Sequence, residues 1–215
     1  MVSNAHVIAI SYKNKDWFSK GTLIYHPALI DAWARRIASN EAGYLVKYLP
    51  ITPNDTFASN VADLAVAVAG MDYDPMKVGG EIGEIRGFVE PYEGMEVKKY
   101  GRTTNLTKAE IIASAGSIKV KGYPWGWAVF RDVFITTPFA KAGDSGSAIV
   151  HDDKLVGVLF AGSEEISVGC KAKYLHLLGV ALSEEMARVH PVEAMGAVLP
   201  AVIAGGSVIY SETQE

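Results

Sequence analysis

Gly143-Asp144-Ser145-Gly146-Ser147 places a serine between two glycines. Glycine adopts backbone conformations that are closed to other residues, and it leaves nothing bulky beside the hydroxyl. A nucleophilic serine needs that exposure, together with backbone N–H groups directed at the charge that develops on a substrate oxygen. Two apolar stretches, 148–150 and 155–160, follow with a polar turn between them, which predicts a hairpin with the serine in the loop at its entrance. Taken alone, the run also fits a glycine-rich turn, so the rest of the chain must decide.

A nucleophilic serine requires a base, and the base requires an acid that orients it. Among the five histidines, His6 lies where small residues meet an apolar run. Asp63 stands out among the acids because it is set into the apolar stretch 61–68, where a charge is unfavourable unless it has a partner. The alternative is that Asp63 only caps the end of a strand in solvent. His6, Asp63 and Ser145 are therefore the candidate catalytic residues.

Five segments of the chain resemble motifs of the chymotrypsin-like (trypsin-fold) serine peptidases. Ser3-Asn4-Ala5-His6-Val7 resembles the histidine motif of that family, Ala62-Asp63-Leu64-Ala65-Val66 its aspartate motif, and the run 143–147 its serine motif. The order His, Asp, Ser is that of this family and differs from the order in subtilisins and α/β-hydrolases. Residues 101–107 resemble the opening of the second barrel in the disulfide-free bacterial, phage and archaeal branch, and residues 156–163 are similar to the strand that lines the substrate groove.

The resemblance covers about residues 1–180 and implies an all-β fold of two antiparallel β-barrels of the six-stranded type, with a C-terminal helix. Residues 1–93 would form the first half with the histidine and the aspartate. Residues 94–190 would form the second half with the serine and end in a helix, and residues 191–215 would be a tail.

The same resemblance implies a serine endopeptidase that works through an acyl-enzyme. In that mechanism His6 is the general base, Asp63 holds its imidazole, and the backbone N–H groups of Gly143 and Ser145 form the oxyanion hole. Asp144 carries over as a structural residue. In many family members the matching aspartate receives a freed amino terminus, but here Met1 lies too near His6 in the sequence for that role to be assumed.

The substrate pocket implied by the resemblance is apolar. Phe139 lies six positions before Ser145, where enzymes that prefer Arg or Lys carry a carboxylate. A substrate cation would be left without a partner there, so we expect cleavage after apolar or small residues. Glu164 or Glu165 is the alternative source of charge, if the loops differ in length. The predicted pocket residues are Phe139, Phe160, Ala161 and Gly162.

Alternating apolar residues and turn signals predict the strands directly. In the second half they give six strands, over 95–100, 109–121, 127–136, 147–151, 155–161 and 168–174. In the first half they give four, over 1–10, 21–25, 44–51 and 61–69, and helical spacing predicts helices over 27–40 and 175–190. A trypsin-like first barrel has six strands, two of them before the histidine motif, whereas five residues precede His6. Two explanations stay open: a shortened reading frame, or strands supplied by the tail over 198–215.

Composition agrees with a globular enzyme. The chain has 215 residues, 49% of them hydrophobic, which suffices for a sizeable core, and its net charge of −4 offers no basic footprint for nucleic acid. No apolar run has the length of a membrane span, and no secretory signal opens the chain. The single Cys170 excludes an internal disulfide, which favours an intracellular or viral setting. We expect a polypeptide substrate and neither a cofactor nor a metal ion, and the oligomeric state stays open.

Two other classes of function also stay open. One is a peptidase-like binding module that has lost its activity, and the other is an esterase or self-processing relative that uses the same triad. A catalytic Cys170 is disfavoured because no histidine motif lies beside it.

Overall fold

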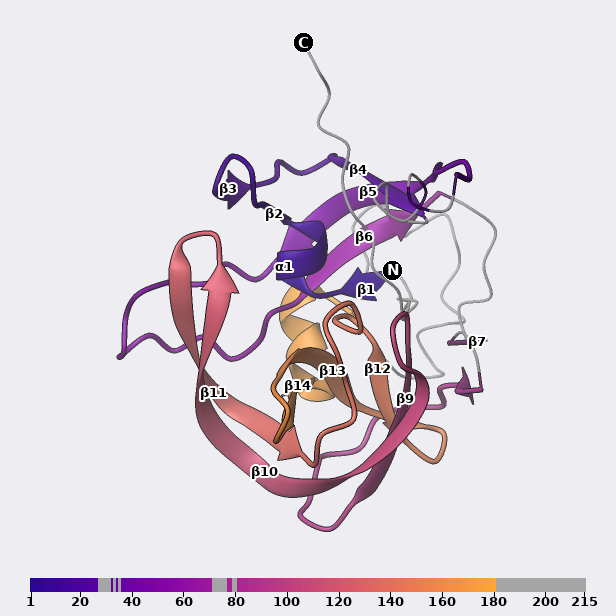
Figure 1. Cartoon of the computed structure of the whole chain (residues 1–215), viewed down its shortest axis with the longest axis vertical. Coiled ribbons are helices and arrows are strands. Elements are labelled where there is room, and N and C mark those ends of the chain that lie inside the picture. Colours follow the sequence, from indigo (N-terminus) through magenta and orange to yellow (C-terminus); the bar gives the residue numbers. More distant parts are fainter. Residues whose placement is uncertain (27–31, 33, 35, 71–76, 79–80, 181–215) are drawn as a thin grey trace.

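The structure is a computed structural model that describes residues 1–26, 32, 34, 36–70, 77–78 and 81–180 (Figure 1). Strands dominate these residues, which confirms the predicted all-β class. They form two main assemblies, an open sheet from the first half of the chain and a closed barrel from the second half. Two short hairpins accompany them, β2 (Ile10–Ser11) with β3 (Asp16–Trp17), and β7 (Lys77–Val78) with β8 (Gly83–Glu84).

The first assembly is an antiparallel sheet of four strands, the number that the sequence predicts for this half. Val2 pairs with Val66 and Tyr44 pairs with Val68, so the N-terminal segment adds to the edge of a longer hairpin. Among the described residues the sheet does not close into a barrel. Its strands in spatial order are β1 (Val2–Ser3), β6 (Ala65–Ala69), β5 (Asn40–Tyr48) and β4 (Leu23–His26).

Two predicted strands are shorter than expected, and both corrections concern the candidate site. His6 lies on a helical turn, α1 (Ala5–Ile8), rather than on a strand. The turn forms because Ala5, Ile8 and Ala9 have helical spacing and are all fully buried. Asp63 precedes β6, which begins at Ala65 and not at residue 61.

The second assembly is a closed barrel of six antiparallel strands, and each of them overlaps a predicted strand. Gly157 and Gly169 allow neighbouring strands and the Phe134 ring to approach closely: a Cβ on Gly157 would lie 2.0 Å from the carbonyl oxygen of Cys170, and one on Gly169 would lie 2.1 Å from the ring. In spatial order the strands are β10 (Asn105–Tyr123), β11 (Gly126–Thr136), β14 (Ser167–Lys171), β13 (Lys154–Gly162), β12 (Ala148–His151) and β9 (Glu96–Gly101).

Both assemblies contribute to one apolar core, in which Leu45 and Leu64 of the first half join Phe130 and Val158 of the second. Asn60 fastens the two together, because its backbone oxygen accepts from Arg131 N at 2.8 Å and its side-chain amide donates to Val129 O at 3.0 Å. The division of the chain at residue 93 stays a prediction.

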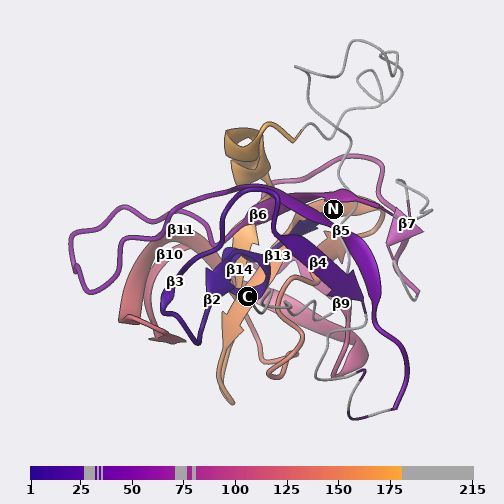
Figure 2. The same ribbon diagram turned by 90° about the horizontal axis from the view of Figure 1, so that it is seen from above.

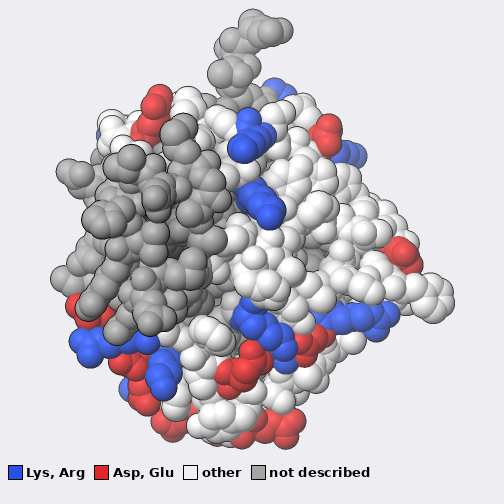
Figure 3. All heavy atoms as spheres, turned by 180° about the vertical axis from the view of Figure 1, so that it is seen from behind, with Lys and Arg blue, Asp and Glu red and all other residues white. Residues whose placement is uncertain are grey.

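At the start of the predicted C-terminal helix the described residues form a 3₁₀ helix, η1 (Ala172–Leu178), which is capped by Gly179 with φ of 79°. Residues 181–190 of the helix predicted over 175–190, the tail predicted over 191–215, and part of the helix predicted over 27–40 lie outside the described residues. Within the described part of the chain, no helix combines the length and the apolar character needed to cross a membrane. On the face shown in Figure 3, basic and acidic side chains are interspersed.

Candidate active site

His6 and Asp63 are in direct contact. The imidazole Nδ1 lies 2.7 Å from Asp63 Oδ2, and the backbone N–H of His6 donates to Asp63 Oδ1 at 3.0 Å. The carboxylate is fully buried, whereas the His6 side chain is 19% exposed. Asn4 fixes the same segment because its amide donates to the backbone oxygen of Asp63 at 2.8 Å. The helical turn α1 thus holds the imidazole at the surface with its Nδ1 edge on a buried carboxylate.

The Asp63 carboxylate is held in its ionised form. Burial by itself would raise its pKa, but the charge and hydrogen bonds of His6, together with a hydrogen bond from Tyr123, outweigh burial and hold the pKa below the usual value. The alternative that Asp63 caps a strand in solvent is therefore wrong. An ionised Asp63 orients the imidazole with Nδ1 as the donor, which leaves Nε2 free to accept a proton.

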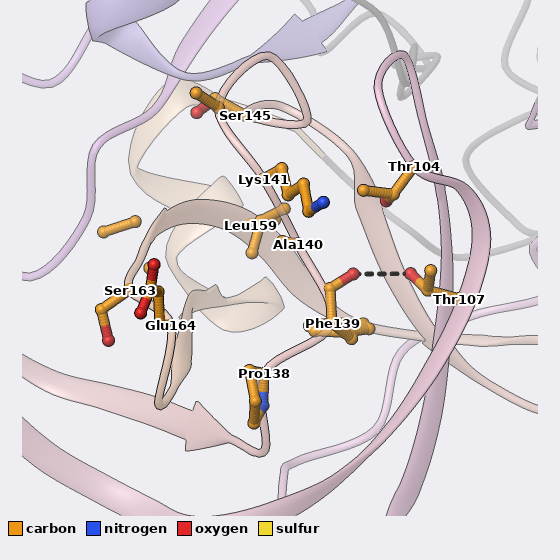
Figure 4. A pocket seen from close by; sticks show the side chains of 13 residues that line it. Thr104, Thr107, Pro138, Phe139, Ala140, Lys141, Ser145, Leu159, Ser163 and Glu164 are labelled. Carbon is orange, nitrogen blue, oxygen red and sulfur yellow. Dashed lines mark hydrogen bonds between the residues drawn. The ribbon is translucent and has the colours of Figure 1, made fainter.

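The Ser145 loop is seated against the segment that precedes His6. Gly146 has φ of 88°, and a Cβ there would lie 2.5 Å from Ser3 Oγ and 3.8 Å from Asn4 N. The loop is also tied to β13, because Gly146 N donates to Leu159 O at 2.9 Å. This close approach brings the serine loop beside the histidine turn, and Figure 4 shows Ser145 at one end of the adjacent pocket.

The two predicted oxyanion-hole residues flank Asp144, whose side chain anchors the loop. Gly143 has φ of 97°, a conformation that glycine adopts without strain. The buried Asp144 carboxylate accepts from Thr103 N at 2.7 Å, Thr104 N at 3.1 Å, Thr104 Oγ1 at 2.7 Å and Lys141 N at 3.0 Å. These hydrogen bonds hold the pKa of Asp144 below its usual value even though burial opposes them.

Lys99 supplies the positive partner of Asp144, with Nζ 3.3 Å from Oδ2 and both side chains fully buried. The ammonium also donates to Thr104 Oγ1 and to Asn105 O. Sequence reasoning left this partner unidentified. The alternation of side chains along the strand could have identified it, because Lys99 lies on the same face of β9 as the buried Val97.

A pocket opens beside Ser145 and contains three of the four predicted pocket residues (Figure 4). The Phe139 side chain is buried in the apolar cluster that contains Val97 and Phe134, and its backbone is held by Thr107 Oγ1 at 2.7 Å and Ser167 Oγ at 3.2 Å. The pocket is lined by Thr104, Thr107, Pro138, Phe139, Ala140, Lys141, Ala142, Ser145, Leu159, Ala161, Gly162, Ser163 and Glu164.

Phe160 is the correction to the predicted pocket. Its ring packs against Phe130 in the core, with a centroid separation of 4.8 Å. Leu159 and Ala161 line the pocket, whereas Phe160 does not. Leu159 is the wall residue that the sequence argument missed, and Glu164 is the acidic residue that reaches the pocket.

No protein-family model matches the sequence, and no curated protein matches it either. Among solved structures, the chain is similar to a Nocardiopsis protease (NAPase) with a TM-score of 0.53 and 17% identity, over 83% of this chain and 81% of that one. A chymotrypsin from Cellulomonas bogoriensis is similar at a TM-score of 0.48 and 21% identity, over 75% and 86% of the two chains. Thermobifida fusca protease A is similar at 0.48 and 18% identity, over 74% and 95%. The similarity to the Nocardiopsis protease agrees with the chymotrypsin-type fold that the motifs of this chain predict.

Proposed function

We propose that this protein is a serine endopeptidase that hydrolyses peptide bonds through Ser145, His6 and Asp63. The observation that carries the proposal is the buried Asp63 carboxylate on His6 Nδ1, beside a serine loop seated by Gly146. The neighbours of similar fold are proteases, which agrees with a hydrolase of this class.

The proton path follows from the tautomer. Because Nδ1–H donates to Asp63, Nε2 of His6 accepts the proton of Ser145 as Oγ attacks the scissile carbonyl carbon. The backbone N–H groups of Gly143 and Ser145 donate to the oxyanion of the tetrahedral intermediate. His6 then protonates the leaving amine, and the C–N bond breaks to give an acyl ester on Ser145. Water, deprotonated by His6, attacks this ester. His6 then gives that proton to Ser145 Oγ as the ester C–O bond breaks, which releases the acid and the free serine.

The pocket favours apolar or small side chains at the residue before the cleaved bond. Phe139, Leu159 and Ala161 are among the residues that line it. A substrate ammonium or guanidinium would lose its water there without a carboxylate at the base to pair with. Glu164 lies among the lining residues but is exposed, so the surrounding water weakens its attraction for a substrate cation.

A fluorophosphonate that reacts only with activated serines tests the proposal. The wild-type chain should be labelled at Ser145, and Ser145→Ala and His6→Ala should each lose labelling and nearly all peptide hydrolysis. The double variant should be little worse than either single variant, because triad members act as a unit. Ser117→Ala is the matched control, since Ser117 is exposed on β10 and does not line the pocket, and it should keep full labelling. Retained hydrolysis in Ser145→Ala would refute the assignment.

Two outcomes would redirect the proposal. A wild-type chain that binds peptides but takes no label would be a binding module. Hydrolysis of esters without hydrolysis of peptides, or a purified chain of reduced mass, would indicate the esterase or the self-processing enzyme.

A further inference from the structure

Asp63 has a second side-chain partner that sequence reasoning did not identify. The hydroxyl of Tyr123 donates to Asp63 Oδ2 at 2.6 Å, the same oxygen that lies 2.7 Å from His6 Nδ1. Tyr123 is the last residue of β10 and is buried. Its ring stands edge-on to the imidazole, with centroids 6.2 Å apart and planes at 89°. One tyrosine therefore contacts both the acid and the base of the candidate triad.

The Tyr123 hydroxyl acts only as a donor in this position. Burial and the neighbouring Asp63 carboxylate raise the pKa of Tyr123 well above its ordinary value, so the hydroxyl keeps its proton throughout the working pH range. Together with His6 N on Oδ1 and His6 Nδ1 on Oδ2, it gives the carboxylate three donors on two oxygens. Three donors fix the plane of the carboxylate, and that plane sets where His6 Nδ1 can donate.

The hairpin that carries Tyr123 is fastened to the first half of the chain at its tip. Trp125 donates from its indole Nε1 to Lys15 O at 2.6 Å, and its ring lies 5.2 Å from that of Trp17. Asn54 grips the other side, donating from Nδ2 to Trp125 O at 2.7 Å and from its backbone N to Trp127 O at 2.8 Å. Figures 1 and 2 both show the β10–β11 hairpin on the same side of the molecule as β3.

We propose that Tyr123 is a positioning residue of the triad, held on Asp63 by the docked hairpin tip, and that its hydroxyl sets both the orientation of the carboxylate and the share of its charge available to His6. This inference rests on the proposed function. It does not make Tyr123 a catalytic residue, because its hydroxyl acts through Asp63 and His6 and not on the substrate.

Tyr123→Phe tests the hydroxyl while keeping the ring. On the plateau of the pH profile, kcat should fall about tenfold with KM unchanged, because the carboxylate loses one of three fixing donors. Without the Tyr123 hydroxyl, more of the negative charge on Asp63 Oδ2 would act on the His6 imidazolium, so this ion would persist to higher pH. The acid limb of the kcat/KM profile should therefore move to higher pH.

Tyr174→Phe is the matched control. Tyr174 also donates its hydroxyl to a carboxylate, Asp132 Oδ2 at 2.5 Å, but in an ion cluster that shares no residue with the triad. It should leave the acid limb in place. A Tyr123→Phe variant with unchanged kcat and an unmoved limb would overturn the inference. So would a lower kcat with an unmoved limb, since that is the signature of a purely structural role.

Two further measurements keep the inference separate from the proposed function. The first is the proton NMR signal of His6 Nδ1–H, identified as the downfield resonance lost in His6→Gln, which should shift in Tyr123→Phe and stay in Tyr174→Phe. If the wild-type chain proves inactive, the proposed function fails and this signal alone decides the role of Tyr123: a shift supports it and no shift overturns it.

The second measurement is the pH profile of Asn54→Ala, a variant that loosens the hairpin tip and keeps the Tyr123 hydroxyl. Its kcat should fall and its acid limb should move to higher pH, as in Tyr123→Phe but by a smaller amount. Wild-type behaviour of Asn54→Ala would overturn the role of the docked tip.

Discussion

Replacing Lys99 by Met tests whether the buried ion pair beneath the serine loop supports the site. Lys99 is fully buried, and its Nζ lies 3.3 Å from Asp144 Oδ2. Methionine has a similar length and volume, so the substitution removes the charge without opening a large cavity. Asp144 would then be a buried carboxylate that has lost its only cationic partner among the described residues.

The magnitude follows from what remains around Asp144. Removing one member of a buried pair typically destabilises a protein by about 3–5 kcal/mol. Asp144 keeps its hydrogen bonds from Thr103, Thr104 and Lys141. Burial lowers the pKa of Lys99 more than Asp144 raises it. Part of the attraction between Lys99 and Asp144 is therefore used to offset the cost of burying the Lys99 ammonium. We therefore expect the lower end, about 3 kcal/mol, or a Tm lower by about 6–12 °C for a chain of this size.

Activity should fall more steeply than stability alone would explain. Asp144 lies between Gly143 and Ser145, so movement of its carboxylate would misdirect the N–H groups proposed to form the oxyanion hole. The loss of one such donor lowers kcat by on the order of 10²-fold. Urea unfolding and peptide hydrolysis on the same preparations measure the two effects, with Lys98→Met as the control because that side chain points away from the barrel interior. If Lys99→Met loses less than about 1 kcal/mol and keeps its kcat, the pair does not support the site.

Three further predictions concern the acid, the pH dependence and the pocket. Asp63→Asn should lower kcat on the order of 10⁴-fold because the amide would favour the wrong imidazole tautomer, and an equal loss in Asp55→Asn instead would contradict the assignment. Burial alone would raise the pKa of Asp132, but hydrogen bonds from Lys171 and other neighbours outweigh burial and lower this pKa from 3.8 to about 2. Asp132 therefore binds its proton more readily in the unfolded chain. The ionised Asp132 therefore contributes about 1–2 kcal/mol to the free energy of unfolding above pH 4, and this contribution is lost as the pH falls toward 2. In Asp132→Asn the free energy of unfolding should depend less on pH across that window. In a peptide library, cleavage should follow apolar or small residues, and a dominant preference for Arg or Lys would refute the pocket formed over Phe139.

The barrel was predictable from the sequence because its strands alternate and are separated by local turn signals. The register of β9 follows that rule, with Val97 and Lys99 inward and Lys98 between them. The contact between His6 and Asp63 was predictable because each residue lies in a short motif of neighbouring residues, and the catalytic roles of His6, Asp63 and Ser145 stay a proposal. The sequence argument was wrong where two short-range patterns competed. Val2 and Ile8 fit a strand, but the spacing of Ala5, Ile8 and Ala9 favours the helical turn that carries His6.

The supports of the site were not predictable because they join residues that are far apart in the chain. Tyr123 meets Asp63 across 60 positions, and Asp144 meets Thr103 across 41. From the sequence, the Gly122-to-Gly126 turn fits an aromatic hairpin tip that covers a barrel edge better than a loop that contacts substrate. Its role depends on where the tip docks, and Asn54 and Lys15 set that position from the other half of the chain.

A single strand connects the two supports. Thr104, at the turn just before β10, binds Asp144 beneath the serine, and Tyr123, at the end of the strand, binds Asp63 behind the histidine. The pairing of β10 with β11 shifts register several times along its length, and such bulges bend a strand, so that both ends return to the site. A module that only bound peptides would need the pocket, but it would gain nothing from a buried carboxylate with three donors or from a buried lysine beneath a serine. Both are unfavourable to bury without a compensating role, so their presence on either side of Ser145 favours the enzyme over the binding module.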